Sequence, residues 1–235
     1  MKLEICANSY QSAQNAQEAG AHRIELCTEL AVGGLTPSYG LIKEVIENLD
    51  IPVFVLIRPR SGNFMYSDSE FEIMKQDIQL CRSLGCSGIV SGVLHANNTV
   101  DIERTESLIE FSKPLRFTFH RAFDCVPNPI DSLEQLIDLG VDRVLTSGQE
   151  VSAEQGLELL KQLKVKANKN IRILPGSGIN PSNAKLFKDS GFDEIHASAS
   201  KAISSTDSTY FGSVGQSVSD VATIKEILKS IRDEI

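Results

Sequence analysis

Five residues that can transfer protons or bind anions lie within otherwise apolar runs of this chain, namely Glu4, Glu25, Arg58, His120 and His196. Carboxyl and imidazole groups act as general acids and bases, and a guanidinium binds carboxylate or phosphate. When buried in a low-dielectric interior, such groups must pair or shift their pKa values, as they do in catalytic sites. The sequence therefore predicts that the two glutamates and the two histidines are candidate catalytic residues. The competing interpretation is a structural ion network in which the arginine neutralises a glutamate.

Two short segments share one alternating pattern, Leu3-Glu4-Ile5-Cys6 and Ile24-Glu25-Leu26-Cys27. Successive side chains of a strand point to opposite faces, so each glutamate shares a face with the cysteine two residues later. The apolar faces belong against helices, and we therefore expect both Glu-Cys pairs to line the interior of a barrel. The same alternation directs a further set inward, formed by Arg58, Arg60, His120, His196 and Ser198.

Cys6 and Cys27 occupy matching positions at the ends of neighbouring predicted strands. Adjacent strands lie about 4.8 Å apart, which leaves two thiols within reach of one metal ion. Two thiolates with few other ligands suit the soft ion Cu(I), whereas Zn²⁺ takes four ligands in a tetrahedron. The sequence therefore predicts Cu(I) as the bound ion. The alternative is that both cysteines are small buried packing residues.

The segment Gly176-Ser177-Gly178 follows a predicted strand and precedes a predicted helix. Its glycines expose backbone N–H groups, and barrels of this class often bind phosphate between the loops after strands seven and eight. Ser198 adds a hydroxyl at the end of the next strand, and Arg58 and Arg60 complete the predicted anion-binding set. The alternative is that this segment forms only a tight turn.

The elements that must position these residues follow from a repeated pattern of helix, glycine and apolar strand. Gly20, Gly85, Gly140 and Gly191 each fall where a helix would end. Eight strands are predicted to start near Leu3, Arg23, Val53, Gly88, Leu115, Asp142, Ile171 and Asp193. Helices are predicted near 9–19, 37–49, 67–84, 101–112, 129–139, 153–168, 181–190 and 217–233. Residues 198–216 form the longest predicted connection between a strand and the following helix.

Eight strand-helix units in 235 residues predict an α/β fold, a single (β/α)₈ TIM barrel that spans residues 1–235 as one domain. Active sites of such barrels lie at the C-terminal ends of the strands, where the longer predicted loops gather. An open doubly wound sheet is the competing fold. It is disfavoured because no GxGxxG motif follows the first strand.

The amino-acid composition limits which classes of partner the protein is expected to bind and in which compartment it is expected to lie. The net charge of −8 opposes binding to phosphate backbones, so no nucleic acid is expected. An acidic residue interrupts the apolar N-terminus and no apolar run reaches about 18 residues, so neither a signal peptide nor a membrane span is predicted. Five cysteines without a disulfide-framework spacing fit the reducing cytoplasm.

Seven motifs, in order along nearly the whole chain, resemble the CutC family, cytosolic proteins named for copper homeostasis. They are LEIC, IELC-TEL-AVGGLTPS at 24–38, IRPRSGNFMYSD at 57–68, FTFHRAFD at 117–124, VLTSGQ at 144–149, LPGSGIN at 174–180 and EIHAS at 194–198. The resemblance implies a (β/α)₈ barrel, a cytoplasmic location, a homodimer and copper binding, with Cys6 and Cys27 at the positions of the family's two strand-end cysteines. The chain departs from the family pattern R-P-R-G-G-D-F by carrying Asn63 in place of the aspartate. If that aspartate were a general acid or a metal ligand, Asn63 could not replace it.

The sequence thus predicts a cytoplasmic copper homeostasis protein that binds Cu(I) at the C-terminal face of a TIM barrel. The alternative function is a TIM-barrel enzyme of lyase, isomerase or hydrolase type that acts on a small anionic metabolite, with or without a phosphate group. A third class, a scaffold that binds without catalysis, also fits these residues.

Overall fold

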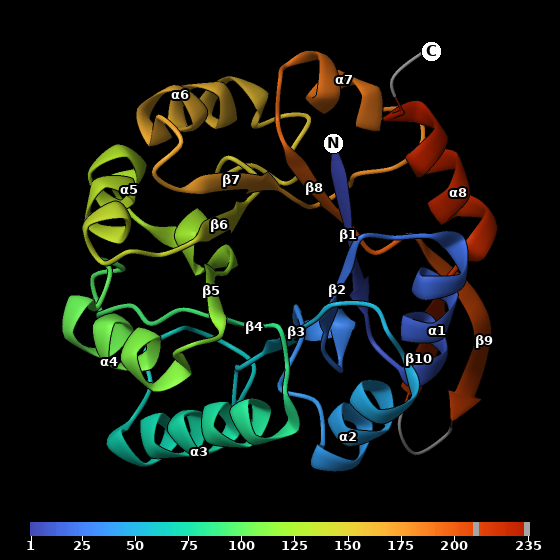
Figure 1. Ribbon diagram of the computed structural model, residues 1–235, viewed down its shortest axis with the longest axis horizontal. Helices are drawn as coiled ribbons and strands as arrows, with labels where there is room; N and C mark the ends of the chain where they lie inside the picture. The colour runs from blue at the N-terminus through green and yellow to red at the C-terminus, as the bar shows by residue number, and fades with distance from the viewer. Residues whose placement is uncertain (209–211, 233–235) are drawn as a thin grey trace.

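The computed structural model describes residues 1–208 and 212–232, and Figure 1 shows strands arranged in a ring surrounded by helices. The elements up to the middle of the chain are β1 (Lys2–Ala7), α1 (Tyr10–Ala19), β2 (Arg23–Leu26), η1 (Leu30–Val32), α2 (Tyr39–Asn48), β3 (Val53–Leu56), α3 (Asp68–Leu84), β4 (Gly88–Ser91) and α4 (Ile102–Ser112). The remaining elements are β5 (Arg116–Phe119), η2 (Arg121–Cys125), α5 (Pro129–Asp138), β6 (Arg143–Thr146), α6 (Leu157–Ala167), β7 (Arg172–Pro175), α7 (Ala184–Asp189), β8 (Glu194–Ala197), β9 (Ser200–Ser208), β10 (Gly212–Ser219) and α8 (Val221–Ser230).

The first eight strands form one sheet in the order β7-β6-β5-β4-β3-β2-β1-β8, and all its paired neighbours are parallel. A parallel bridge between Gly176 and His196 joins the β7 and β8 edges and nearly closes the ring. The predicted (β/α)₈ barrel is confirmed, and the open sheet is excluded. Among the helices of residues 1–208 and 212–232, none is long and apolar enough to cross a membrane.

The helix ends follow from local sequence. Ser67 and Glu70 form a capping box at the start of α3, which satisfies backbone N–H groups that the first turn leaves unpaired. At the other end Gly85 has φ +79°, a left-handed conformation that a Cβ would strain. Gly20, Gly140 and Gly191 also have positive φ, so all four predicted helix-ending glycines are confirmed in that role.

The core has two parts, which reflect the two faces of the strands. Leu3 and Ile5 belong to the large apolar cluster between the sheet and its helices. Cys6 and Cys27 belong to a small separate cluster inside the barrel, with Phe54, Leu56 and Val90. The predicted alternation of β1 and β2 is therefore confirmed, and the interior of the barrel receives the residues that carry chemistry.

The segment after β8 differs from its prediction as a long connection. It forms the antiparallel hairpin of β9 and β10, beside α1, and its tip at residues 209–211 lies outside the described residues. Asn15 Nδ2 donates to Ser219 O at 2.8 Å and fastens β10 to α1. The last helix therefore begins at Val221, after the Asp220 cap, rather than near 217.

Two further helices also start later than predicted, α6 at Leu157 and α7 at Ala184. The residues before each helix form turns instead, with backbone or side-chain hydrogen bonds such as Asn180 N to Asn183 Oδ1 at 2.9 Å. Such local bonds compete with the helical pattern at a helix start, which the spacing of apolar residues does not reveal.

Candidate functional site

A network of buried charges fills the barrel interior at the level where β1 meets β2 and β8. Arg23 Nε donates to Glu4, and Arg23 Nη2 donates to Glu194 Oε2 at 2.5 Å. Arg143 Nε lies 3.4 Å from the same oxygen of Glu194. Burial raises the pKa of Glu4, but the charge of Arg23 and a hydrogen bond with His196 outweigh burial and lower that pKa to about 2. The predicted catalytic residue Glu4 therefore lies inside an ion network, outside the residues that line the cavity above it.

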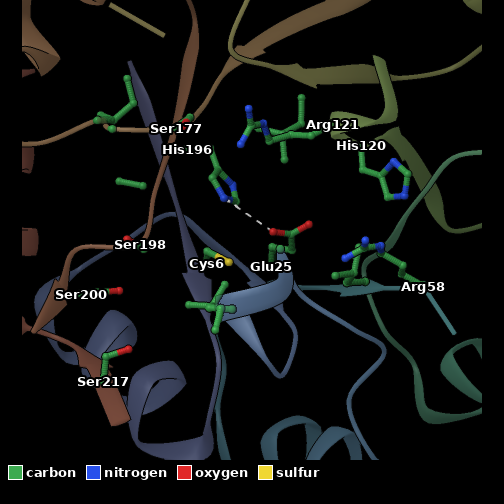
Figure 2. A pocket seen from close by; sticks show the side chains of 18 of the residues that line it. Cys6, Glu25, Arg58, His120, Arg121, Ser177, His196, Ser198, Ser200 and Ser217 are labelled. Carbon is green, nitrogen blue, oxygen red and sulfur yellow. Dashed lines mark ion pairs between the residues drawn. The ribbon is translucent and has the colours of Figure 1, made fainter. Parts of the chain in front are cut away.

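Above this network, a cavity of about 570 Å³ opens at the C-terminal ends of the strands (Figure 2). Its polar lining comes from both halves of the chain, as the barrel topology requires. It consists of Cys6, Glu25, Arg58, His120, Arg121, Ser177, Gly178, His196, Ser198, Ser200 and Ser217. The predicted site residues Glu4, Cys27, Arg60 and Gly176 do not belong to this lining.

The centre of the cavity holds Glu25, His196 and Cys6, drawn facing one another in Figure 2. His196 Nε2 lies 3.6 Å from Glu25 Oε2, and His196 Nδ1 lies 2.8 Å from Glu4 Oε1. Burial lowers the pKa of His196, but contacts with Cys6 and the two glutamates outweigh burial and raise it well above its ordinary value. Burial raises the pKa of Glu25. This arrangement places a carboxyl and an imidazole where they can exchange a proton with a bound molecule.

The two strand-end cysteines meet as predicted. Cys6 Sγ lies 3.6 Å from Cys27 Sγ, and both thiols are free. Cys6 reaches the cavity, whereas Cys27 is fully buried behind it. The hydrogen bond with Cys27 and burial raise the pKa of Cys6 well above its ordinary value. Ligand atoms of Cys6, Glu25 and His196 lie within 4.8 Å of one another, so sulfur, oxygen and nitrogen donors converge at one point.

One wall of the cavity carries Arg58 and His120. Three backbone carbonyls hold the Arg58 guanidinium: Nη1 donates to Val32 O and Gly34 O at 2.8 Å each, and Nη2 donates to Gly62 O at 3.0 Å. Within the described part of the chain, Arg58 Nε finds no hydrogen-bond partner. The three carbonyls therefore fix the position of the Arg58 guanidinium, whose Nε–H group has no hydrogen-bond partner among the described residues.

His120 stands beside this cation, with the Phe64 ring 4.8 Å from its own ring. His120 Nδ1 accepts a hydrogen bond from Ala122 N at 3.2 Å, so the neutral ring carries its proton on Nε2. That Nε2 has no partner among the described residues. Burial and the nearby charge of Arg58 lower the pKa of His120 to about 3, so the ring is neutral near pH 7.

The predicted phosphate loop contributes only part of its residues to the cavity. Ser177 and Gly178 line it, and Ser198 lies at the adjoining end of β8. Gly176 N instead donates to Thr146 O within the sheet, at 3.0 Å. A Cβ at Gly176 would stand 3.3 Å from His196 Cβ. The absence of a side chain at this glycine therefore lets β7 approach β8 and leaves room for His196.

Arg60 lies away from the cavity, and the prediction that it joins Arg58 in binding an anion is not supported by its position. β3 ends at Leu56, so strand alternation does not extend as far as Arg60. Arg60 Nε donates to Glu70 Oε1 at 2.5 Å, on the outer side of the loop. Asn63 Oδ1 accepts from Arg60 Nη2 at 3.1 Å. Asn63 thus braces the loop around Arg60 and lies outside the cavity lining.

Sequence reasoning missed several residues of the interior. Arg23 alternates with Glu25 and Cys27 on β2, so the strand period could have identified it. Ser200 follows Ser198 closely enough for the sequence to predict a second hydroxyl donor there, and it lines the cavity. Ser217 was missed, because it reaches the cavity only where β10 turns back along β9. No spacing within the sequence signals that return.

Comparisons with known proteins agree with this architecture. The CutC family model matches residues 1–201. A "family protein CutC" of Pasteurella multocida is 49% identical over 199 residues, which cover 84% of this chain and 82% of the relative. A "copper homeostasis protein cutC homolog" of Homo sapiens is 48% identical over 198 residues, which cover 84% of this chain and 72% of the relative.

Solved structures give the same result for the fold. The crystal structure described as a copper homeostasis protein CutC from Streptococcus agalactiae superposes with a TM-score of 0.80 at 36% identity, over 84% of this chain and 98% of that one. Thiamine phosphate pyrophosphorylase from Pyrococcus furiosus superposes with a TM-score of 0.62 at 17% identity, over 98% of this chain and 95% of that one. The second likeness concerns the fold alone.

Proposed function

Because the chain belongs to the CutC family, we propose that it serves copper homeostasis by binding Cu(I) through Cys6 and Cys27. The observation that carries this proposal is the pair of free thiols, 3.6 Å apart, of which Cys6 lines the cavity and Cys27 is buried behind it. Thiolates are the ligands that Cu(I) prefers in proteins. Relatives of this chain carry a copper homeostasis name, which supports the same ion.

The sulfur positions suit an ion bound to one side of the line that joins them. Metal–thiolate bonds measure about 2.3 Å, so two sulfurs 3.6 Å apart hold an ion in a bent arrangement with room for a third ligand. Ligand atoms of His196 and Glu25 lie on the cavity side, and the imidazole would have to release its proton before it could bind an ion. Since the pKa of Cys6 is raised, the ion must displace the thiol proton, and we expect Cu(I) affinity to increase with pH.

A competition titration with a Cu(I) chelator under reducing conditions tests this proposal. Cys6→Ser and Cys27→Ser, singly and together, should abolish tight binding because a hydroxyl is a poor ligand for a soft ion. Cys125→Ser is the matched control, since Cys125 is exposed and lies outside the cavity lining. Unchanged Cu(I) affinity in the double variant would show that these cysteines are not the copper site.

A second function, an enzyme that acts on a small anionic metabolite, is favoured by a different observation. The cavity of about 570 Å³ far exceeds the space of one ion and lies within the size range of small-molecule sites. Glu25 and His196, 3.6 Å apart, provide an acid–base pair at its centre, and Glu4 holds the imidazole from behind at 2.8 Å. Arg58 supplies the positive charge that an anion requires.

Proton exchange in D₂O tests this second function. ¹H NMR should show that the protein accelerates exchange of carbon-bound protons next to the carbonyl in a panel of small oxo acids, with pyruvate as the first member. Glu25→Gln and His196→Asn should each abolish the acceleration, and Arg60→Gln should leave it unchanged. If the wild-type chain is no faster than Glu25→Gln on any member of the panel, the acid–base role is wrong.

We also propose the cytoplasm as the compartment, supported by five free cysteines and by the preference of Cu(I) sites for reducing conditions. The homodimer and the absence of nucleic-acid partners stay predictions from the sequence.

A further inference from the structure

Two buried hydrogen-bond donors in one wall of the cavity have no partner among the described residues, Arg58 Nε and His120 Nε2. Their residues are 5% and 4% exposed, so bulk water does not compensate them. A buried polar group without a partner is unfavourable, and such groups in native proteins commonly mark the place of a bound ligand, ion or water. Two such donors on side chains that lie side by side in one cavity wall therefore indicate a ligand that accepts hydrogen bonds.

The charge of this wall selects the class of ligand. Arg58 contributes one positive charge, and burial together with that charge keeps His120 neutral near pH 7. Arg121, at the same side of the cavity, is already paired with Asp124 at 2.8 Å, and His196 faces Glu4 and Glu25. One remaining positive charge and two donors complement a monoanion with two acceptor oxygens, which describes a carboxylate. A phosphate dianion would leave one negative charge unbalanced beside Glu25.

The opposite wall is polar and uncharged. Ser198, Ser200 and Ser217 lie on that side in Figure 2, across Glu25 and His196 from Arg58. Hydroxyl groups both donate and accept, so they match hydroxyl groups of a ligand and give no compensation for a second charge. Ser217 comes from β10, which follows the part of the chain that the family model matches.

We propose that the cavity binds a small hydroxy acid, with its carboxylate on Arg58 Nε and His120 Nε2 and its hydroxyl groups toward Ser198, Ser200 and Ser217. This inference rests on the metabolite function proposed above and names its class of substrate. The ligand then crosses the centre of the cavity, where its carbon atoms face Glu25 and His196. Phe64 packs against both anchoring side chains, at 4.8 Å from the His120 ring and 5.1 Å from the Arg58 guanidinium, and fixes their positions.

Binding of three probes with the same carbon skeleton tests the proposal on the full chain, kept free of copper by a chelator. The probes are glycerate, which carries the carboxylate, glycerol, which lacks it, and glycerol 3-phosphate. NMR titration follows the imidazole signals, which are readily assigned because the chain has only four histidines. Glycerate should shift the His120 signals and bind at least about tenfold more tightly than either other probe, because only it provides a charged acceptor of the right valence.

Two substitutions of His120 separate the donor from the packing of the ring. His120→Asn keeps an acceptor for Ala122 N but removes the donor at the Nε2 position, and should weaken glycerate binding by about tenfold or more. His120→Gln places an amide N–H near the Nε2 position and should restore most of the affinity. Arg58→Lys should also weaken binding, since an ammonium lacks the directed Nε donor, and Arg60→Lys is the control outside the cavity.

The outcomes are distinct. Glycerate that does not bind at 50 mM probe concentration, about the weakest affinity of interest for a fragment, overturns the proposal. Equal glycerate affinity in His120→Asn and the wild type also overturns it. If glycerol 3-phosphate binds more tightly than glycerate, the proposal of a carboxylate ligand is wrong and the site binds a phosphate. If glycerate binds as expected but no proton exchange is observed, the carboxylate site stands and the enzymatic function fails.

Discussion

Two layers of polar residues inside the barrel differ in how completely they are paired. In the lower layer, Arg23 contacts both Glu4 and Glu194. Arg143 Nε makes no hydrogen bond to the described residues but lies 3.4 Å from Glu194, so each charge has an opposite charge beside it. In the upper layer, Arg58 and His120 each retain an unpaired donor that belongs to the cavity wall. Both layers are buried, and burial therefore does not distinguish them.

The two layers therefore have different roles: the lower layer contributes to stability, and the upper layer contributes to binding. A buried charge that loses its partner costs several kcal/mol, so substitutions in the lower layer should destabilise the fold. An unpaired donor is a cost that the free protein carries and that a ligand removes on binding. The paired layer therefore serves as the floor of the site, and the unpaired layer serves as its recognition surface.

The largest expected effect is in the lower layer. Arg23→Met should reduce the free energy of unfolding by about 3–5 kcal/mol, because Glu4 and Glu194 would remain buried without their shared partner. Urea denaturation followed by circular dichroism measures the change. A loss below about 1 kcal/mol, the range of an exposed ion pair, would show that this layer does not hold the barrel together.

A smaller, pH-dependent effect is expected in the upper layer. The pKa of His120 is about 3 in the folded chain, and an unfolded histidine titrates near pH 6.5. Between these values only the unfolded chain takes up the proton, so stability should fall as pH falls below 6.5, by up to about 1.4 kcal/mol per pH unit. His120→Asn should show a flatter dependence of unfolding free energy on pH between 6.5 and about 4. Parallel curves for the two proteins would mean that His120 accepts a proton in the folded state.

The lower layer should respond to acid in a different range. Glu4 has a pKa of about 2 in the folded chain against an ordinary value of 4.5, so its contribution is present above pH 4.5 and is lost as pH falls toward 2. Glu4→Gln should lower stability by a constant amount above pH 5 and remove this part of the acid dependence below it, so the slope of stability against pH between 6.5 and 5 should stay unchanged. Unfolding curves at closely spaced pH values distinguish the two layers, and a changed slope of the Glu4→Gln curve between pH 6.5 and 5 would contradict the assignment.

The smallest effect is expected outside the barrel. Arg60 and Glu70 form an ion pair whose side chains are 37% and 25% exposed, and Arg60→Gln should cost only about 0–1 kcal/mol. It should leave both Cu(I) affinity and glycerate affinity unchanged. A larger loss of either affinity would show that Arg60 itself acts on the cavity, although it lies outside the lining.

The part of the site that the sequence predicts lies on regular strands. The positions of Glu4, Glu25, Cys6 and Cys27 follow from the two-residue period of β1 and β2, which holds as long as the strand is regular. Arg60 lies four residues beyond Leu56, the end of β3, in a loop that no longer alternates, whereas Cys27 directly follows β2 and still obeys its alternation.

Other features depend on packing between distant segments. The pairing of Arg23 with Glu194 joins residues far apart in the chain, and only barrel closure brings β2 and β8 to the two sides of β1. The wall that contains Ser217 depends on the hairpin of β9 and β10, whose register is fixed by backbone pairing. Sequence alternation therefore predicts the face of the sheet on which a residue lies, and tertiary contacts decide its layer and whether it is paired.

The proposal that Cys6 and Cys27 bind copper is tested most directly by X-ray absorption spectroscopy of the Cu(I)-loaded chain. The spectrum identifies the neighbours of the ion by element and so distinguishes sulfur from nitrogen and oxygen. The account predicts two sulfur neighbours, from Cys6 and Cys27, and the loss of one of them in Cys27→Ser. A spectrum with only nitrogen and oxygen neighbours, or one that Cys27→Ser leaves unchanged, would contradict it.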